Sequence, residues 1–271
     1  MTRHRFAVIG KPIAHSLSPI IHQLFAQQMK IELTYEKILG DEINFEQQVR
    51  DFFAAAGAGL NITLPFKERA FALATEHSNL CLQAGAANTL WIKQGQINAE
   101  NTDGIGLIRD LSSAINVTDK NILILGAGGA VRGILGPLLA EKPASIVVAN
   151  RTRAKAEALR LDFPQIICAD LSQLTGTFEL IINATSASLD GTLVTIPEHC
   201  FAIKPFCYDL AYHAHKPTAF VAFAKSQGCK ARDGLGMLVE QAAQAFRVWH
   251  GLMPATEPVL VQLRKELGDL I

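Results

Sequence analysis

The sequence predicts an α/β protein made of two α/β domains with a ligand cleft between them. Three observations predict this class. Short apolar runs alternate with amphipathic stretches of helical period, the alternation restarts midway along the chain, and a glycine-rich turn follows the first strand of the second series. With 271 residues, 49% of them hydrophobic, the chain is long enough for two modest domains, each with a buried core.

The first half predicts a series of strands and helices that ends near residue 102. Strands are expected at residues 5–10, 33–39, 59–65, 86–93 and 96–101, the last two paired around a turn at Gln94-Gly95. Helices are expected at 19–29, which Pro19 opens, at 44–57, which Gly57 closes, at 66–75, and from Asp103 onward.

The second half repeats the alternation. Strands are expected at 121–126 and 144–150, and three further buried strands at 165–170, 178–185 and 206–211. Helices are expected at 129–141, 153–163, 217–227, 237–251 and 256–267. The last two helices are strongly apolar, so they must bury their apolar faces against a sheet. We therefore expect them to pack on the first domain. The predicted domains are therefore 1–102 plus 237–271, and 103–236.

Composition excludes several classes of partner. The 25 basic and 25 acidic residues balance, and the pI is near 7.1, so we expect no nucleic-acid partner. No apolar run reaches the roughly 18 residues of a membrane helix, and the first residues lack the apolar core of a signal peptide. A cytoplasmic monomer or homodimer is expected.

The cysteines predict free thiols in a reducing compartment. There are five, and none forms a C-x-x-C pair. His199, Cys200, Cys207, His213 and His215 lie close together in sequence, but their spacing fits no zinc pattern. Apolar neighbours surround both of these cysteines, so we favour core packing and loop surface over a metal site.

A glycine-rich turn at 126–130 predicts a dinucleotide site. Glycines let the chain turn tightly from strand to helix and let backbone N–H groups approach a pyrophosphate, which the helix N-terminus favours. The third glycine of G-x-G-x-x-G is replaced by Val131, so the motif alone is weak. The strand before it, the helix after it and the strand ending at Asn150 strengthen the prediction. The residues concerned are Gly126, Ala127, Gly128, Gly129 and Ala130.

The end of the next strand favours NADP over NAD. An NAD site usually places an acidic residue there to hold the ribose hydroxyl, whereas this chain has Asn150 followed by Arg151, Thr152, Arg153, Ala154 and Lys155. Amide and cationic donors suit a 2′-phosphate. Solvated basic residues at a helix start are the simpler interpretation, yet three cations there oppose the helix dipole unless an anion lies between them.

Polar residues of the first half cluster where strands are expected to end. They are Ser16 and Ser18 after the first strand, Asn61, Thr63 and Lys67 around the third, Asn88, and Asp103. Ser18 and Asp103 could each simply cap a helix, and Lys67 could be a surface charge. Together, however, hydroxyls and amides with one lysine and one aspartate suit a small polyhydroxylated acid, since ligands lie outside strand carboxyl ends.

These stretches resemble the shikimate dehydrogenase family along nearly the whole chain. The matching motifs are GKPIAHSLSP, NITLPFK, GAANT, NTDGIG, GAGGA, NRT, IINATS and DGLGMLVEQA. The resemblance implies a substrate domain, a Rossmann-type NADP domain, and reversible NADPH-dependent reduction of 3-dehydroshikimate to shikimate in aromatic amino-acid biosynthesis.

The resemblance also implies residue roles. Lys67 and Asp103 would form a catalytic pair. The substrate would lie against Ser16, Ser18, Asn61, Thr63, Asn88, Gln241 and Tyr212. NADP would contact residues 126–130 and 150–155, together with Thr185, Leu210 and Gly234 at or near its nicotinamide end.

Three stretches depart from the family pattern, and two alternatives remain open. The acidic residue often found near position 79 is Asn79 here, Ala187-Ser188 replaces a common glycine, and the order of Pro217 and Thr218 is rearranged. A quinate/shikimate dehydrogenase with broader substrate and cofactor use would carry an acidic residue near 150. A non-catalytic shikimate sensor would lack Lys67 or Asp103.

Overall fold

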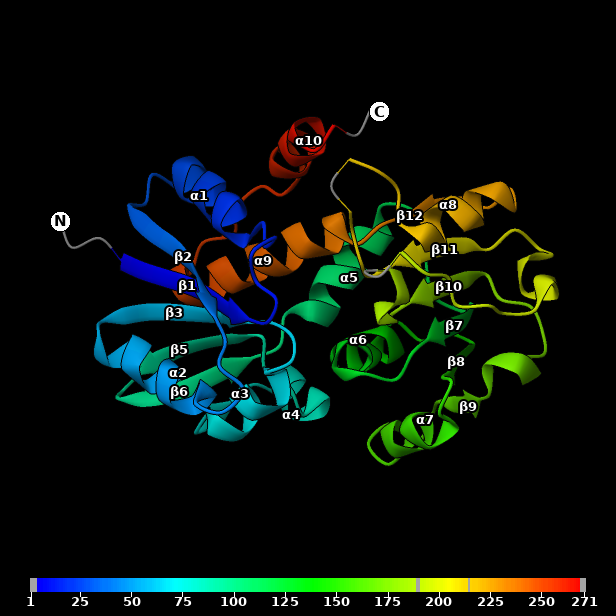
Figure 1. Cartoon of the computed structure of the whole chain (residues 1–271), viewed down its shortest axis with the longest axis horizontal. Helices are drawn as coiled ribbons and strands as arrows, with labels where there is room; N and C mark the ends of the chain where they lie inside the picture. Colours follow the sequence, from blue (N-terminus) through cyan, green and yellow to red (C-terminus); the bar gives the residue numbers. More distant parts are fainter. Residues whose placement is uncertain (1–3, 189–190, 214, 269–271) are drawn as a thin grey trace.

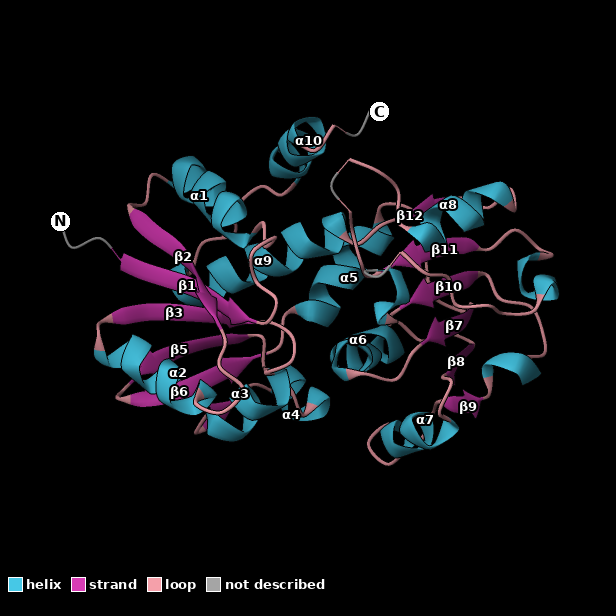
Figure 2. Cartoon of the chain, in the orientation of Figure 1, coloured by secondary structure: helices cyan, strands magenta, loops and turns pink. Residues whose placement is uncertain are grey.

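The strands form two separate sheets, one from each half of the chain. The structure is a computed structural model that describes residues 4–188, 191–213 and 215–268, so parts of both expected domains lie outside the described residues. Within those ranges each sheet has six strands. The sheets lie at opposite ends of the molecule with helices between and around them, as Figure 1 and Figure 2 show.

The first sheet is mixed. Its spatial order is β2 (Leu33–Leu39), β1 (His4–Gly10), β3 (Gly57–Ile62), β5 (Thr89–Lys93), β6 (Gln96–Glu100) and β4 (Glu76–His77). β1 pairs in parallel with both β2 and β3, so their carboxyl ends meet at one edge. β5 and β6 run antiparallel around Gln94 and Gly95, both of which have positive φ. That backbone is typical of a tight hairpin turn.

Helices cover both faces of this sheet. Ala7 and Ile9 point to α2 (Phe45–Ala54), α3 (Lys67–Leu73) and α4 (Asn79–Ala84). Phe6 points the other way, to α1 (Ser18–Met29), α9 (Leu235–His250) and α10 (Glu257–Glu266). The alternation along β1 follows from the two-residue period of a strand. The last two helices therefore pack with the first sheet, although the second sheet precedes them in the chain.

The second sheet is entirely parallel. Its order is β12 (Ala231–Arg232), β11 (Phe206–Asp209), β10 (Leu180–Asn183), β7 (Asn121–Leu125), β8 (Ser145–Ala149) and β9 (Ile167–Ala169). One face packs on α5 (Asp103–Ser112), α6 (Gly129–Ala140) and α7 (Arg153–Arg160), and the other on α8 (Ala219–Ser226). This is the doubly wound order of dinucleotide-binding sheets, and its direction reverses between β7 and β10. Short 3₁₀ turns lie at Leu171–Gln173, Ser186–Ser188 and Glu198–Phe201.

Helices α5 and α9 connect the two sheets. They lie side by side in the middle of the molecule (Figure 1), and a side chain at Gly106 would overlap the Cβ of Gln241 at 2.7 Å. Gly104 lies equally close to Pro137 of α6, because a Cβ there would be 2.4 Å from its ring. Glycine on α5 thus lets three helices meet at close range. In the described part of the chain no helix has the length and apolarity needed to span a bilayer.

The structure corrects several expected elements. The strand at residues 165–170 is not buried: it shortens to β9 at the edge of the sheet, where Ile167 is 53% exposed. Gly57 does not close α2, because Ala56 adopts the left-handed backbone (φ 59°) and Gly57 already begins β3. The sequence does not predict strands β4 and β12 or helix α4. Segments of two to six residues are too short to show the periodicity of a strand or a helix.

Candidate active site

Lys67 and Asp103 form an ion pair at the carboxyl edge of the first sheet. Lys67 begins α3 just after β3, and Asp103 begins α5 just after β6. Lys67 Nζ lies 2.5 Å from Asp103 Oδ2, and the side chains are only 15% and 7% exposed. Low exposure strengthens the interaction and fixes the direction of the ammonium group.

Asp103 does not serve as a helix cap. The N-cap position of α5 is Thr102, and neither side chain caps the helix. The Asp103 carboxylate instead binds Lys67 through Oδ2 and accepts a hydrogen bond from Asn88 Nδ2 (2.9 Å) through Oδ1. The helix-capping interpretation of this aspartate is therefore wrong, and its side chain is available to orient the lysine.

Asn88 is the centre of a buried polar network. Its side-chain NH₂ also lies within hydrogen-bonding distance of Thr102 Oγ1 (2.9 Å) and Gln241 Oε1 (3.2 Å). Its Oδ1 accepts from the backbone N–H of Thr102 (2.9 Å). Gln241 comes from α9, so a residue near the end of the chain joins the network of the first half. The side chain of Asn88 is 2% exposed, and such a satisfied network is rigid.

A second branch leads to the serine pair through Tyr35. Asn61 donates to the backbone carbonyl of Asn88 (3.1 Å) and accepts from the Tyr35 hydroxyl (2.7 Å). The Ser18 side chain lies near the same hydroxyl, and its Oγ accepts from Ser16 Oγ at 3.2 Å. Burial raises the pKa of Tyr35 well above its usual value, so the phenol stays neutral. Hydrogen bonds thus run from Tyr35 to Lys67, and the serine pair lies beside Tyr35.

Ser18 likewise does not cap α1. The N-cap position is Leu17, Ser18 is the first helical residue, and its hydroxyl turns to Ser16 and Tyr35. Thr63 follows β3 and is half-buried. Tyr212 arrives from the loop after β11 and contacts the backbone of Leu17. Tyr212 therefore brings the second half of the molecule to the serine pair.

One residue of the network, Tyr35, is not predicted by the sequence. Tyr35 lies in the middle of β2, and a search restricted to strand ends passes over it. Its ring is held by stacking on His22, with centroids 4.4 Å apart and planes at 12°. Thr102, by contrast, belongs to the polar run Asn101-Thr102-Asp103 that the sequence predicts at the end of the first domain.

We expect Tyr35→Phe to raise KM for a ligand that binds at the serine pair by roughly tenfold, with a smaller effect on kcat. The substitution keeps the ring and its stack on His22 but removes the hydroxyl that holds Asn61 next to the serine pair. Steady-state kinetics checks the prediction. Tyr208→Phe is the matched control, because Tyr208 donates to Asp110 (2.6 Å) far from the serine pair. An equal rise in KM in both variants would contradict the prediction.

The glycine turn leaves an open helix N-terminus at the edge of the second sheet. Gly126 has φ 108°, and a Cβ there would press against the carbonyl of Ala184 at 3.0 Å. Gly128 precedes α6, and a Cβ at Gly128 or Gly129 would meet nothing within 4 Å. The backbone N–H groups of this first turn can therefore reach an anion. Ala127 and Ala130 flank it, both half-buried.

The missing third glycine of the motif has a structural explanation. Val131 is fully buried in the core under the second sheet. The close approach that a third glycine would permit falls instead at Gly133, where a Cβ would lie 3.0 Å from Asp103 Oδ2. The helix that begins at the glycine turn therefore runs directly past the Lys67–Asp103 pair.

The basic segment after β8 is exposed, and its cations differ in their partners. Arg153 pairs with Glu157 (3.1 Å) and Asp170 (3.7 Å). Among the described residues, Arg151 and Lys155 have no ion pair. Asn150 donates to the carbonyl of Thr152 (2.9 Å), which fixes the turn into α7. Thr152 and Ala154 are exposed.

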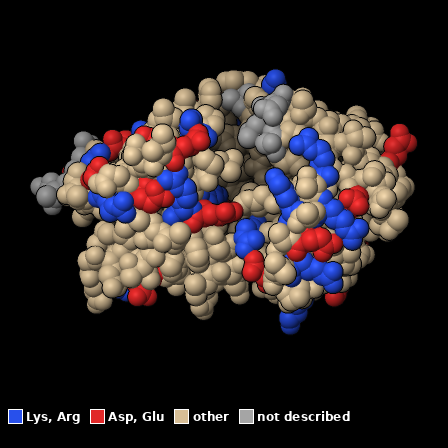
Figure 3. All heavy atoms as spheres, turned by 60° about the horizontal axis from the view of Figure 1, so that its bottom comes forward, with Lys and Arg blue, Asp and Glu red and all other residues tan. Residues whose placement is uncertain are grey.

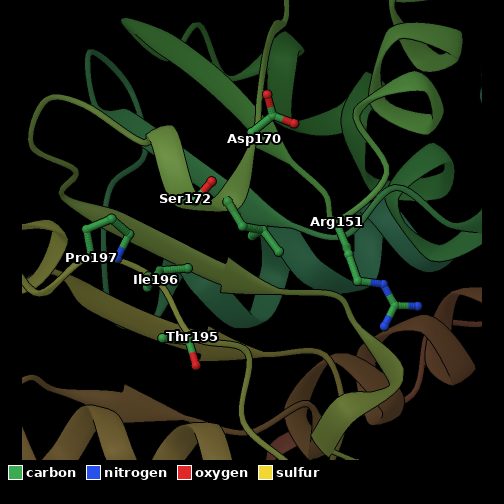
Figure 4. A pocket seen from close by; sticks show the side chains of 7 residues that line it. Arg151, Asp170, Ser172, Thr195, Ile196 and Pro197 are labelled. Atoms are coloured by element: carbon green, nitrogen blue, oxygen red, sulfur yellow. The ribbon is translucent and has the colours of Figure 1, made fainter.

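A pocket of about 550 Å³ opens beside Arg151. Figure 4 shows Arg151 at one side and Ile196 and Pro197 at the other, with Asp170 and Ser172 between. The lining combines one cation and one carboxylate with apolar side chains of Leu171, Ile196 and Pro197. In the space-filling view (Figure 3), Lys and Arg gather on this half with acidic residues among them, and the surface is hollowed between the halves.

Thr185, Leu210 and Gly234 meet at the carboxyl ends of β7, β10 and β11. The Cγ2 of Thr185 is 3.3 Å from the Cβ position of Gly126. Leu210 donates to the carbonyl of Asn183 (2.9 Å), and a Cβ at Gly234 would lie 2.1 Å from the Leu210 carbonyl oxygen. Glycine at 234 is thus required by the close contact.

The cysteines and histidines between His199 and His215 lie near one another in the sequence but do not gather around one site in the described structure. Cys200 and Cys207 are buried under the second sheet, where burial raises the pKa of Cys207 well above the range of a reactive thiol. Within the described ranges no three metal-ligating side chains converge.

Comparison with known proteins assigns the family. Family models match residues 8–90 (shikimate dehydrogenase substrate binding domain), 109–195 (shikimate/quinate 5-dehydrogenase) and 234–264 (shikimate 5′-dehydrogenase C-terminal domain). A relative from Legionella pneumophila (strain Lens), named shikimate dehydrogenase (NADP(+)), is 60% identical over 96% of this chain and 98% of its own.

Solved structures of similar proteins have the same fold as this chain. An Ael1 enzyme from Pseudomonas putida has a TM-score of 0.90 at 45% identity, covering 96% of this chain and 98% of its own. Shikimate 5-dehydrogenase from Thermus thermophilus, in complex with NADP(H) and shikimate, has a TM-score of 0.88 at 32% identity, covering 97% and 99%. The chain belongs to the shikimate dehydrogenase family.

Proposed function

We propose that the chain is an NADP-dependent shikimate dehydrogenase that reversibly reduces 3-dehydroshikimate to shikimate in aromatic amino-acid biosynthesis. The observation that carries the proposal is the hydrogen-bonded network from Tyr35 to Lys67 at the edge of the first sheet, with the serine pair beside it. It offers hydroxyl and amide groups for a polyhydroxylated acid and ends at an ammonium group. The relative from Legionella pneumophila bears the name of the same activity.

The chemistry follows from the ion pair. Bound NADPH supplies a hydride to the ketone carbon of the substrate. The negative charge that then develops on the carbonyl oxygen is stabilised by the Lys67 ammonium, which donates the proton that completes the hydroxyl group. Asp103 holds the lysine in place and can accept a hydrogen bond from a neighbouring substrate hydroxyl. In the reverse direction Lys67 accepts the proton.

The proposed substrate contacts divide by chemistry. Ser16 and Ser18 donate hydroxyls to the ring carboxylate, and Tyr212 lies beside them. Asn61, Thr63, Asn88 and Gln241 bind the ring hydroxyls. Because Asn88 and Gln241 already contact one another (3.2 Å), a bound ring would find its partners preorganised.

The proposed cofactor contacts follow the second sheet. The N–H groups of residues 126–130 would hold the pyrophosphate, and the pocket beside Arg151 would hold the adenine. The 2′-phosphate lies at 150–155, with Arg151 as its principal cation. Thr185, Leu210 and Gly234 line the nicotinamide end. We propose the domain division 1–102 plus 237–271 and 103–236, a cytoplasmic location, and a monomer or homodimer.

Absorbance at the NADPH band tests the proposal. We expect turnover of shikimate with NADP⁺, and a kcat/KM for quinate or for NAD⁺ at least about tenfold lower. Equal use of quinate or NAD⁺ would identify the broader quinate/shikimate enzyme. Binding of shikimate without turnover in any of the four combinations would identify a sensor and reject the dehydrogenase.

A further inference from the structure

Asp209 is a fully buried carboxylate at the end of β11 that accepts four hydrogen bonds. Its Oδ2 accepts from Ser188 Oγ and Thr218 Oγ1, both at 2.6 Å. Its Oδ1 accepts from Asn183 Nδ2 and the backbone N–H of Ala211, both at 3.1 Å. Burial raises the pKa of Asp209, while these hydrogen bonds oppose the rise. None of the ion pairs among the described residues includes it.

The donors come from three segments: the end of β10 with the connection after it, the loop after β11, and the start of α8. Asn183 is the last residue of β10, Ser188 belongs to the connection after it, and Ser188 Oγ also accepts from Asn183 Nδ2 (3.0 Å). Ala211 belongs to the loop after β11. Thr218 caps α8 by accepting from the backbone of Val221 (3.2 Å). One carboxylate therefore ties together the loops that follow two neighbouring strands and the start of the next helix.

These segments also form the wall between the glycine turn and the serine pair. Asn183 Oδ1 accepts from the Thr185 hydroxyl (2.8 Å), and Thr185 lies against Gly126. On the other side, Ala211 accepts from the backbone of Gly234 (3.0 Å), and Tyr212 reaches the backbone of Leu17. The Asp209 side chain lies behind this wall and is closed to solvent, so a ligand in the cleft contacts its neighbours and not Asp209.

We propose that Asp209 is a positioning residue for the nicotinamide end of the cofactor. It holds Thr185 and the segment from Leu210 to Tyr212 at the distance from the Lys67–Asp103 pair that hydride transfer requires. The proposal rests on the proposed function. It separates the two ends of the cofactor site, because none of the residues that line the pocket beside Arg151 is hydrogen-bonded to Asp209.

The position of Asp209 explains how the chain accommodates one of its departures from the family pattern. Ser188, where a glycine is common, adds a hydroxyl that would be costly if buried without partners. Its side chain is 1% exposed, and Asp209 and Asn183 satisfy it. Thr218, beside the rearranged proline, likewise donates to Asp209. Ser188 and Thr218 thus both donate to one carboxylate.

The test compares the binding of a fragment of the cofactor with the binding of the whole cofactor. Adenosine 2′,5′-bisphosphate occupies only the adenosine end of the site, whereas NADP⁺ occupies the adenosine end and the nicotinamide end. In Asp209→Asn one side-chain oxygen becomes an NH₂ group, so two of the four donors, either Ser188 and Thr218 or Asn183 and Ala211, lose their acceptor. We expect the Kd of NADP⁺ to rise and kcat to fall, each about tenfold, with the Kd of adenosine 2′,5′-bisphosphate within about twofold of wild type.

Asp110→Asn is the matched control. Asp110 is also buried and accepts from Tyr208 (2.6 Å) and Arg232 (2.9 Å), but its partners do not line the cleft. We expect a loss of thermal stability with both dissociation constants unchanged. Ser188→Ala removes one donor and leaves the charge satisfied, so it should give the Asp209→Asn pattern at about twofold to threefold and serves if Asp209→Asn does not fold.

Two results would overturn the proposal. One is equal weakening of both ligands in Asp209→Asn or Ser188→Ala, which is the behaviour of a purely structural residue. The other is unchanged kcat and NADP⁺ affinity in both variants. Failure of the wild-type protein to bind NADP⁺ would reject the proposed function itself, so the two failures are distinguishable.

Discussion

Replacing Lys67 by alanine is expected to lower kcat by about a thousandfold or more and to change KM for shikimate by less than about threefold. The ammonium group is the only cation within reach of Asp103 among the ion pairs of the described residues. Its largest contribution comes when charge develops on the substrate oxygen, so its loss raises the barrier far more than it weakens ground-state binding. Steady-state kinetics with NADP⁺ and shikimate measures both constants.

Two further variants make the Lys67 experiment specific. Lys93→Ala removes an exposed lysine at the end of β5 and should leave kcat unchanged. Asp103→Asn keeps the size of the side chain but frees the lysine, and should lower kcat less than Lys67→Ala does. Partial recovery of Lys67→Ala by an added small primary amine would support proton transfer by the missing group. An unchanged kcat in Lys67→Ala would remove Lys67 from the mechanism.

Most of the fold can be predicted because its strands and helices repeat along the sequence with clear periods. The strand predicted at residues 33–39 has the bounds of β2, and the helix predicted from Asp103 begins where α5 begins. The prediction of a buried strand at 165–170 is wrong for the exposed edge strand β9, since QIICAD is apolar enough for an interior position. The order of strands in a sheet, which decides which strand is an edge, is not encoded locally.

Partners across the fold are the least predictable part of the candidate site. The sequence suggests that Lys67 and Asp103 belong together, but their 2.5 Å contact depends on α3 and α5 starting at the same sheet edge. The role of Tyr35 cannot be predicted from the sequence, because only the pairing of β2 with β1 brings its hydroxyl to Asn61. Likewise, the basic segment after β8 has three cations, while only the structure shows that Arg153 already has two carboxylate partners.

That difference between the cations leads to the second large expected effect. Arg151→Ala should raise KM for NADP⁺ by about thirtyfold and leave KM for NAD⁺ within about twofold. A guanidinium gains most from a phosphate when no carboxylate competes for it. Arg151, without an ion pair in the described part of the chain and at the side of the adenosine pocket, is that residue.

Arg153→Ala provides the comparison within the same turn of chain. Because Glu157 and Asp170 already neutralise Arg153, its removal should raise KM for NADP⁺ only about threefold. Arg160→Ala, at the far end of α7, should have no effect on either constant. A larger effect from Arg153 than from Arg151, or an equal loss of NADP⁺ and NAD⁺ in Arg151→Ala, would contradict the assignment. In the first case the carboxylates would have to release Arg153 when the 2′-phosphate binds, and cofactor preference would then depend on exchange of ion pairs rather than on a cation held free in advance.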